Sequence, residues 1–189
     1  MADLPRLGHK LATVVCASGF KPDLIVYIET GARLVTVSLC RELGVPAVGV
    51  RASRPGGRLK AFLAPLASRL PRGVKDRLRR WEERSRVHGA TGRTIAWPEH
   101  VSVSGRRVLL VDDAADTGNT IAAVRAELVA RGAEAPAIRT AVLAATSAEG
   151  QREVDFFLFD RNCRMPWSAD SGERRAALVA MRAHQPPQP

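Results

Sequence analysis

Short runs of apolar and branched residues alternate along this chain with segments whose apolar residues recur at helical spacing. Apolar runs of this kind are typical of strands that are buried on both faces of a sheet. Successive parallel strands need a crossover connection, which is usually a helix. The alternation therefore predicts an α/β fold in which helices cover both faces of a mostly parallel sheet.

The bounds of the elements follow from the apolar runs and from glycines that end helices. The predicted strands are Asp23–Glu29, Val45–Val50, Arg107–Val111, Ile138–Ala144 and Val154–Phe159. The predicted helices are one that begins near Leu7 and stops at Gly19, Gly31–Leu43, Thr117–Arg131 and Glu173–Ala183. We expect the tail, Gln185–Pro189, to be disordered, as chain ends often are.

The bulk properties are those of a globular protein in the cytoplasm. A chain of 189 residues with 46% hydrophobic and 25% charged residues can bury its own core. No apolar run approaches the roughly 18–20 residues that span a bilayer, and Met1–Lys10 does not resemble a signal peptide, so we expect no membrane contact. The three cysteines have no metal-site spacing, and we expect buried, reduced thiols.

The sequence from Val108 to Thr120 contains the most specific pattern in the chain. Its four apolar residues, Val108–Val111, predict a buried strand that runs into an acidic loop and then a helix. Backbone N–H groups at the start of that helix, over Thr117–Thr120, would be unpaired and at the positive end of the helix dipole, which suits a phosphate dianion. Gly118 lets the backbone approach such a ligand closely.

Two adjacent acids, Asp112 and Asp113, follow this strand directly. We expect their carboxylates to leave the carboxyl end of the strand side by side, where ligands bind in open α/β sheets. There they can accept hydrogen bonds from vicinal sugar hydroxyls and help to hold Mg²⁺. A plainer interpretation is an acidic cluster that caps the helix without a ligand, since Asp is common before helices. A third acid, Asp116, followed by Thr-Gly-x-Thr favours the ligand site.

The stretch Asp112–Thr120 resembles the signature of the type I phosphoribosyltransferase family, whose members bind phosphoribosyl pyrophosphate (PRPP). The resemblance implies the Rossmann-like fold of that family and its chemistry, in which a nitrogenous base displaces pyrophosphate from C1 of PRPP with Mg²⁺ present. By the same resemblance, Asp112 and Asp113 hold the ribose hydroxyls and the metal, and Asp116 acts as the general base or orients the incoming base. The 5′-phosphate loop then consists of Ala115, Asp116, Thr117, Gly118, Asn119 and Thr120.

A second loop occupies the place at which members of that family carry the pyrophosphate loop. It consists of Glu29, Thr30, Gly31, Ala32 and Arg33. Its backbone amides can bind pyrophosphate oxygens, and Arg33 would add positive charge. A plain helix start, with Gly31 merely allowing the turn, is the alternative.

The net charge of +10 belongs to one segment, Arg51 to Arg93, which contains eleven Arg and two Lys against three acids. We expect a basic pair of helices in residues 51–94, and three interpretations of it stay open. In the first, the helices are solvated and have no specific role. In the second, they form a docking surface for nucleic acid or another polyanion. In the third, they form a mobile hood over PRPP, like the hood of family members. In a hood, Arg54 and Arg58 would supply charge to the pyrophosphate. Nucleic acid is less favoured, because the segment offers only two aromatic residues for stacking, Phe62 and Trp81.

The last predicted strand and the turn after it resemble the end of 6-oxopurine phosphoribosyltransferases, which frames the purine. By that resemblance, Phe157 or Phe159 stacks on the base and Trp167 forms a wall of the acceptor pocket. The alternative is that these aromatics belong to the core. Those enzymes place a Lys near this strand for the purine O6, whereas this chain has no Lys after Lys75. Arg152 is the candidate substitute, with a rigid planar fork in place of a point charge.

The sequence thus predicts a single phosphoribosyltransferase-type domain, residues 1–184, that includes the basic insertion. We favour an enzyme, a Mg²⁺-dependent phosphoribosyltransferase whose partners are PRPP and a small nitrogenous base, with a purine-like acceptor preferred. The alternative is a regulator on the same fold that senses PRPP or a nucleotide and binds nucleic acid or a protein. The presence of Asp116 favours the enzyme, and the clustered charge is better explained by the regulator. A homodimer is left open.

Overall fold

The computed structural model describes residues 4–29, 31–53, 93–161, 163, 165–167 and 171–189. Residues 1–52 and 95–189 form one compact unit, and residues 53–94 form a second. The helices expected in the basic insertion lie outside the described residues, together with Arg54 and Arg58. All the other predicted site residues belong to the first unit.

Six strands form one sheet in the order β3-β2-β1-β4-β5-β6. The strands are β1 (Leu24–Ile28), β2 (Ala47–Ser53), β3 (Thr94–Ala96), β4 (Val108–Ala115), β5 (Ile138–Ala145) and β6 (Phe156–Phe159). β1 pairs in parallel with β2 and β4, and β5 pairs in parallel with β4 and β6. This arrangement confirms the predicted mostly parallel sheet, and it places β4 at an interior position between β1 and β5.

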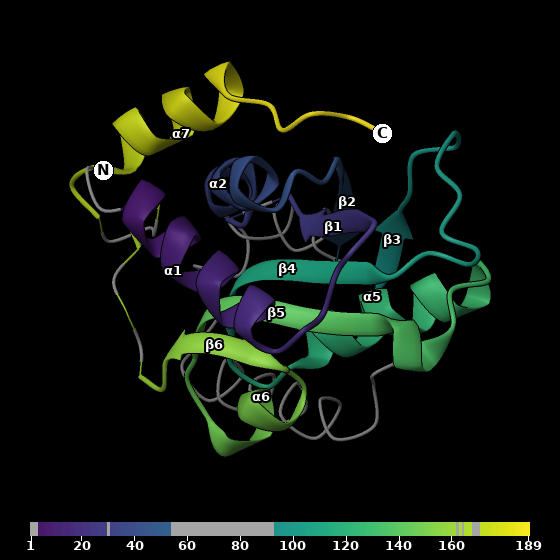
Figure 1. Ribbon diagram of the computed structural model, residues 1–189. Coiled ribbons are helices and arrows are strands. Elements are labelled where there is room, and N and C mark those ends of the chain that lie inside the picture. The colour runs from purple at the N-terminus through teal and green to yellow at the C-terminus, as the bar shows by residue number, and fades with distance from the viewer. Residues whose placement is uncertain (1–3, 30, 54–92, 162, 164, 168–170) are drawn as a thin grey trace, which may run out of the picture. The chain divides into compact units, whose positions relative to one another are not determined.

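Helices cover both faces of the sheet (Figure 1). The helices are α1 (Leu4–Ala17), α2 (Arg33–Leu43), α5 (Asn119–Ala130), α6 (Ala148–Arg152) and α7 (Arg174–Ala183), with a 3₁₀ turn at Ala135–Ala137. Alternate residues of β1 point to opposite faces, so that Ile25 and Tyr27 pack with α1 and α2 while Leu24 and Val26 pack with α5. The full burial of β1 explains why its sequence is apolar throughout.

The strands and long helices agree with the sequence prediction, and the differences lie at their ends. β4 continues four residues beyond Val111, because Asp112, Ala114 and Ala115 pair with β5. The short elements β3 and α6 were not predicted. The backbone N–H of Ala47 donates to the carbonyl of Pro187 at 2.7 Å, and the disorder predicted for the tail stays a prediction. That hydrogen bond gives the backbone N–H of the first residue of β2 an acceptor.

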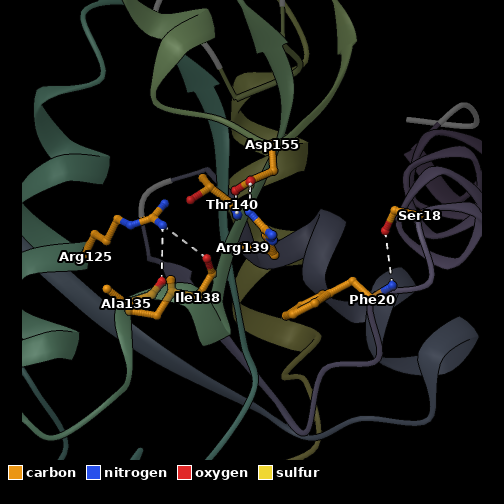
Figure 2. A network of polar contacts seen from close by, with 8 residues as sticks. All are labelled: Ser18, Phe20, Arg125, Ala135, Ile138, Arg139, Thr140 and Asp155. Atoms are coloured by element: carbon orange, nitrogen blue, oxygen red, sulfur yellow. Dashed lines mark hydrogen bonds and ion pairs between the residues drawn. The ribbon is translucent and has the colours of Figure 1, made fainter.

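A polar network fixes β6 beside β5 at the amino end of the sheet (Figure 2). The Asp155 carboxylate accepts from the backbone N–H of Thr140 at 2.8 Å and from the Arg139 guanidinium at 2.9 Å. Asp155 N–H in turn donates to the Thr140 carbonyl at 3.0 Å. On the other side, Arg125 donates to the carbonyl of Ile138, the first residue of β5, at 3.2 Å. These contacts stabilise the sheet away from the carboxyl ends of the strands.

The cysteines only partly follow the sequence prediction. Cys40 is buried in α2, and burial raises the pKa of its thiol to about 12. Cys16 is exposed, so the expectation of buried thiols is wrong for this residue. Within the described residues, no helix combines the length and apolar character needed to cross a membrane.

An ion pair ties the start of β1 to the start of β4. The Asp23 carboxylate accepts from the Arg107 guanidinium at 2.7 and 3.1 Å and from the Arg107 backbone N–H at 3.0 Å. The Arg107 side chain, followed by its backbone N–H, lowers the pKa of Asp23 from 3.8 to about 2. Because the folded pKa lies below the unfolded one, the pair stabilises the fold above about pH 4 and loses that effect as the pH falls towards 2.

We therefore expect wild type to be more stable than Asp23→Asn at pH 6, and the two proteins to become nearly equally stable by pH 2. Urea unfolding at a series of pH values measures this difference in the free energy of unfolding. A difference that is the same at pH 6 and pH 2 would contradict the assignment.

Candidate active site

The two adjacent acids lie at the carboxyl end of β4, in the interior of the sheet. Asp112 is 6% exposed, Asp113 is half-buried, and Asp112 Oδ1 accepts from the Asp113 backbone N–H at 2.8 Å. Both residues are still in the strand, so their side chains start on opposite faces of β4 and not side by side as the sequence reasoning expected. The reason is the extended pairing of β4 with β5.

Asp113 contacts two other predicted site segments. The indole Nε1–H of Trp167 donates to Asp113 Oδ2 at 2.5 Å. Gly31, in the predicted pyrophosphate loop, lies so close that a Cβ on it would overlap the Asp113 carboxylate and would lie 2.6 Å from Trp167 Nε1. The fold thus brings together three segments that the sequence analysis selected separately.

The predicted phosphate loop joins β4 to α5. Asp116 and Thr117 are exposed, and Gly118 is the N-cap of α5 with φ of 70°. Gly118 has no side chain and therefore forms no side-chain capping bond. Only glycine fits here without strain, because φ is positive and a Cβ would overlap the Glu153 side chain. Asn119 and Thr120 are the first two residues of the helix.

The segment after β5 supports the phosphate loop, and the sequence analysis missed it. The backbone N–H of Thr146 donates to the Ala115 carbonyl at 2.8 Å, and its hydroxyl donates to Asp116 Oδ1 at 3.1 Å. Ser147, the N-cap of α6, donates from its hydroxyl to the Asp116 carbonyl. A Cβ on Gly150 would lie 2.5 Å from the Ala115 carbonyl oxygen and closer still to that of Asp116. Ser147, two residues after the end of β5, is a residue type that favours a helix start, but nothing in the sequence showed what α6 packs against.

The predicted pyrophosphate loop carries its own ion pairs. Glu29 Oε2 accepts from Arg51 Nε at 3.0 Å and Nη2 at 2.8 Å, and Arg33 Nη2 lies 3.5 Å from Glu29 Oε1. Arg33 Nη1 also donates to the Met181 carbonyl in α7 at 3.2 Å. The Arg33 side chain therefore faces Glu29 and α7, while the buried Ala32 caps α2. The backbone amides remain the predicted pyrophosphate ligands; Thr30 lies outside the described residues.

The three aromatic residues predicted for the acceptor pocket do not share one environment. Phe159 is half-buried and packs against the hydrophobic cluster that contains Trp167. Phe157 is 36% exposed, and its Cα pairs with that of Val142 in β5. Trp167 is 9% exposed. The predicted contact of these residues with a base stays a prediction.

The fold and the strand-end acids define a class of protein. The chain belongs to the phosphoribosyl transferase domain family, whose sequence model matches residues 6–171. A solved purine phosphoribosyltransferase from Pyrococcus horikoshii has the same fold, with a TM-score of 0.61, 23% identity and coverage of 88% of this chain and 89% of that chain. The predicted family and fold are confirmed.

The similar curated proteins include adenine phosphoribosyltransferases. The one from Sphingopyxis alaskensis is 31% identical over 122 residues, which cover 65% of this chain and 55% of the relative. The one from Mycobacterium tuberculosis is 36% identical over 110 residues, which cover 58% of this chain and 42% of the relative. The chain thus spans about half the length of the curated relatives it matches.

Proposed function

We propose that this protein is a Mg²⁺-dependent phosphoribosyltransferase that transfers the 5-phosphoribosyl group from PRPP to a purine base and releases pyrophosphate. One observation carries the proposal: Asp112 and Asp113 lie near the carboxyl end of the interior strand β4, and the loop after this strand leads into α5, whose N-cap is Gly118. Ligands of open α/β sheets bind at such strand ends, and helix starts bind phosphate. One segment of the chain therefore carries both the carboxylates that can bind a sugar diol and the backbone amides that can bind a phosphate.

In this proposal the loop Ala115–Thr120 binds the 5′-phosphate through the amides at the start of α5. Asp112 and Asp113 accept hydrogen bonds from the ribose hydroxyls, one from each face of β4. The loop Glu29–Arg33 receives the pyrophosphate on its backbone amides. Gly31 in that loop contacts Asp113, which supports adjacent positions for the ribose and the pyrophosphate.

The donor set at the strand end fits Mg²⁺. Mg²⁺ is usually held by one or two carboxylates together with substrate oxygens, and the two carboxylates here are Asp112 and Asp113. Within the described part of the chain, no group of three His, Cys, Asp or Glu side chains is placed to enclose a metal on its own. This fits an ion that arrives with the substrate. When bound, Mg²⁺ would stabilise negative charge on the leaving pyrophosphate.

The chain's own residues act on the sugar and the base. As the bond to pyrophosphate breaks, positive charge develops on the ribose, and carboxylates near the ring stabilise it. Asp116 is exposed at the start of the loop and would accept the N–H of the incoming base, which orients the base or removes its proton. Thr146 fixes Asp116 Oδ1 by a hydrogen bond at 3.1 Å. A hood with Arg54 and Arg58 would exclude water in the same scheme.

A purine acceptor is supported by the names of the similar proteins, which include adenine and purine phosphoribosyltransferases. Among purines, the chain's lack of any Lys after Lys75 favours adenine over a 6-oxopurine, whose O6 would have to rely on a substitute donor such as Arg152. Phe157 and Phe159 are the proposed aromatic residues of this pocket, and the family resemblance adds Trp167 to them. The regulator alternative draws no support from the named relatives, all of which are described as transferases.

Pyrophosphate release tests the proposal. The protein is incubated with PRPP, Mg²⁺ and either adenine, hypoxanthine, guanine or no base. We expect release that depends on one purine and that falls about a hundredfold in Asp116→Asn, within the range for loss of an acid–base group. Asp23→Asn, the same chemical change at the amino end of β1, is the matched control and should leave turnover unchanged. If the folded protein releases no pyrophosphate with any of the three bases, the proposed enzymatic function is wrong.

Three further features belong to the proposal. They are a single domain that includes the basic insertion, a cytoplasmic location, and a homodimer, which the sequence analysis left open. The insertion has its own test, since deletion of Arg72–Arg86 should lower turnover while PRPP binding survives. Full activity after the deletion would exclude a hood role for that part of the chain.

A further inference from the structure

We infer that Trp167 is a positioning residue for the PRPP site, because its indole N–H holds the Asp113 carboxylate in the orientation that receives a ribose hydroxyl or the metal. The inference rests on the proposed function and adds to it the residue that fixes one of the two acids. It assigns Trp167 to the ribose side of the site, whereas the family resemblance assigned this residue to the wall of the acceptor pocket.

Two contacts restrict the Asp113 carboxylate. Oδ2 accepts from Trp167 Nε1 at 2.5 Å. The backbone of Gly31 lies against the same oxygen, at a distance that leaves no room for a Cβ. With Oδ2 fixed, the direction of Oδ1 is set as well, because the carboxylate is planar. A ligand then meets an acceptor that is already oriented, which reduces the entropy lost on binding.

Trp167 itself is buried in the hydrophobic core. The side chain is 9% exposed and belongs to the hydrophobic cluster that also contains Ala32, Met165 and Leu143. A buried indole N–H requires an acceptor, and a carboxylate is a stronger acceptor than a neutral group. Phenylalanine would fill much of the same space without the N–H. The N–H is therefore the part of Trp167 that acts on the site.

Steady-state kinetics of Trp167→Phe separate the two assignments. A positioning residue for Asp113 should raise the KM for PRPP about tenfold and leave kcat within about twofold, because Asp113 keeps its charge in this variant and its hydrogen bond to the ribose is present in both the ground and transition states. The KM for the purine should not change. A higher KM for the purine with an unchanged KM for PRPP would overturn the inference in favour of the pocket wall.

Trp97→Phe is the matched control. Trp97 also donates through Nε1, to the Val101 carbonyl at 3.2 Å, and it packs with the cluster on the opposite face of the sheet. Loss of the Trp97 indole N–H should leave the KM for PRPP unchanged. Calorimetry of wild type with PRPP and Mg²⁺ is run in parallel. If wild type does not bind PRPP, the proposed function fails; if wild type and Trp167→Phe bind equally well, only the inference fails.

A second measurement keeps Trp167 in place, in case Trp167→Phe does not fold. The variant Trp81→Phe/Trp97→Phe leaves Trp167 as the single tryptophan of the chain. Binding of PRPP with Mg²⁺ should change its fluorescence, because the acceptor of its N–H gains a ligand. Unchanged emission at PRPP concentrations that saturate the protein by calorimetry would overturn the inference.

Discussion

Replacing Gly31 with alanine is expected to weaken the binding of PRPP with Mg²⁺ about a hundredfold. The new Cβ would overlap the Asp113 carboxylate. Trp167 holds that carboxylate at Oδ2, so it cannot turn away without breaking a hydrogen bond. Binding would force the displaced carboxylate back against the new methyl group, at an overpacking cost of about 1–3 kcal/mol, and about 2.7 kcal/mol corresponds to a hundredfold change in affinity.

Calorimetric titration with PRPP and Mg²⁺ measures the effect, and thermal unfolding shows whether the variant is folded. The matched control is Gly172→Ala, since a Cβ on Gly172 meets no atom within 4 Å. We expect the control to bind as wild type does. If folded Gly31→Ala binds PRPP as tightly as wild type, then Asp113 and the loop after β1 are not parts of one site.

Replacing Gly150 with alanine is expected to lower the free energy of unfolding by about 1–3 kcal/mol and to reduce PRPP affinity as well. The Cβ would lie 2.5 Å from the Ala115 carbonyl oxygen and closer to that of Asp116, and both are backbone atoms that no rotamer change can move. α6 must therefore move away from the loop after β4, together with the Ser147 hydrogen bond to Asp116.

The sign of the change in the free energy of unfolding is informative, because within a helix alanine is more favourable than glycine by about 1 kcal/mol. Gly150 lies within α6, so helix propensity alone predicts stabilisation. Urea unfolding separates the two outcomes, with Gly172→Ala again as the control. A stabilised Gly150→Ala that binds PRPP normally would show that α6 does not support the phosphate loop.

The sequence predicted the sheet well because its strands are buried on both faces. Five of five residues in β1 are buried, and such runs stand out from amphipathic helices without any knowledge of tertiary structure. The ends of helices were predictable where glycine adopts a positive φ, as at Gly44 with φ of 66°. The end of β4 could not be predicted in this way, because the residues Asp112–Ala115 do not continue the apolar run. Their pairing with β5 holds them in the strand.

The candidate site was predictable as a set of segments but not as an arrangement. The acids after Val111 and the glycine before α5 have local physical reasons, so their pattern was visible in the sequence. The contact of Trp167 with Asp113 joins residues 54 positions apart, and the support of the phosphate loop by α6 depends on tertiary packing. Neither follows from spacing or composition.

The central claim is that the carboxyl end of β4 and the start of α5 bind PRPP. Calorimetric titration of wild type and of Asp112→Asn/Asp113→Asn with PRPP in the presence of Mg²⁺ tests it most directly. We predict saturable binding of one PRPP per chain by wild type and no measurable binding by the folded double variant. Equal binding by both proteins, or no binding of PRPP by folded wild type, would contradict the claim.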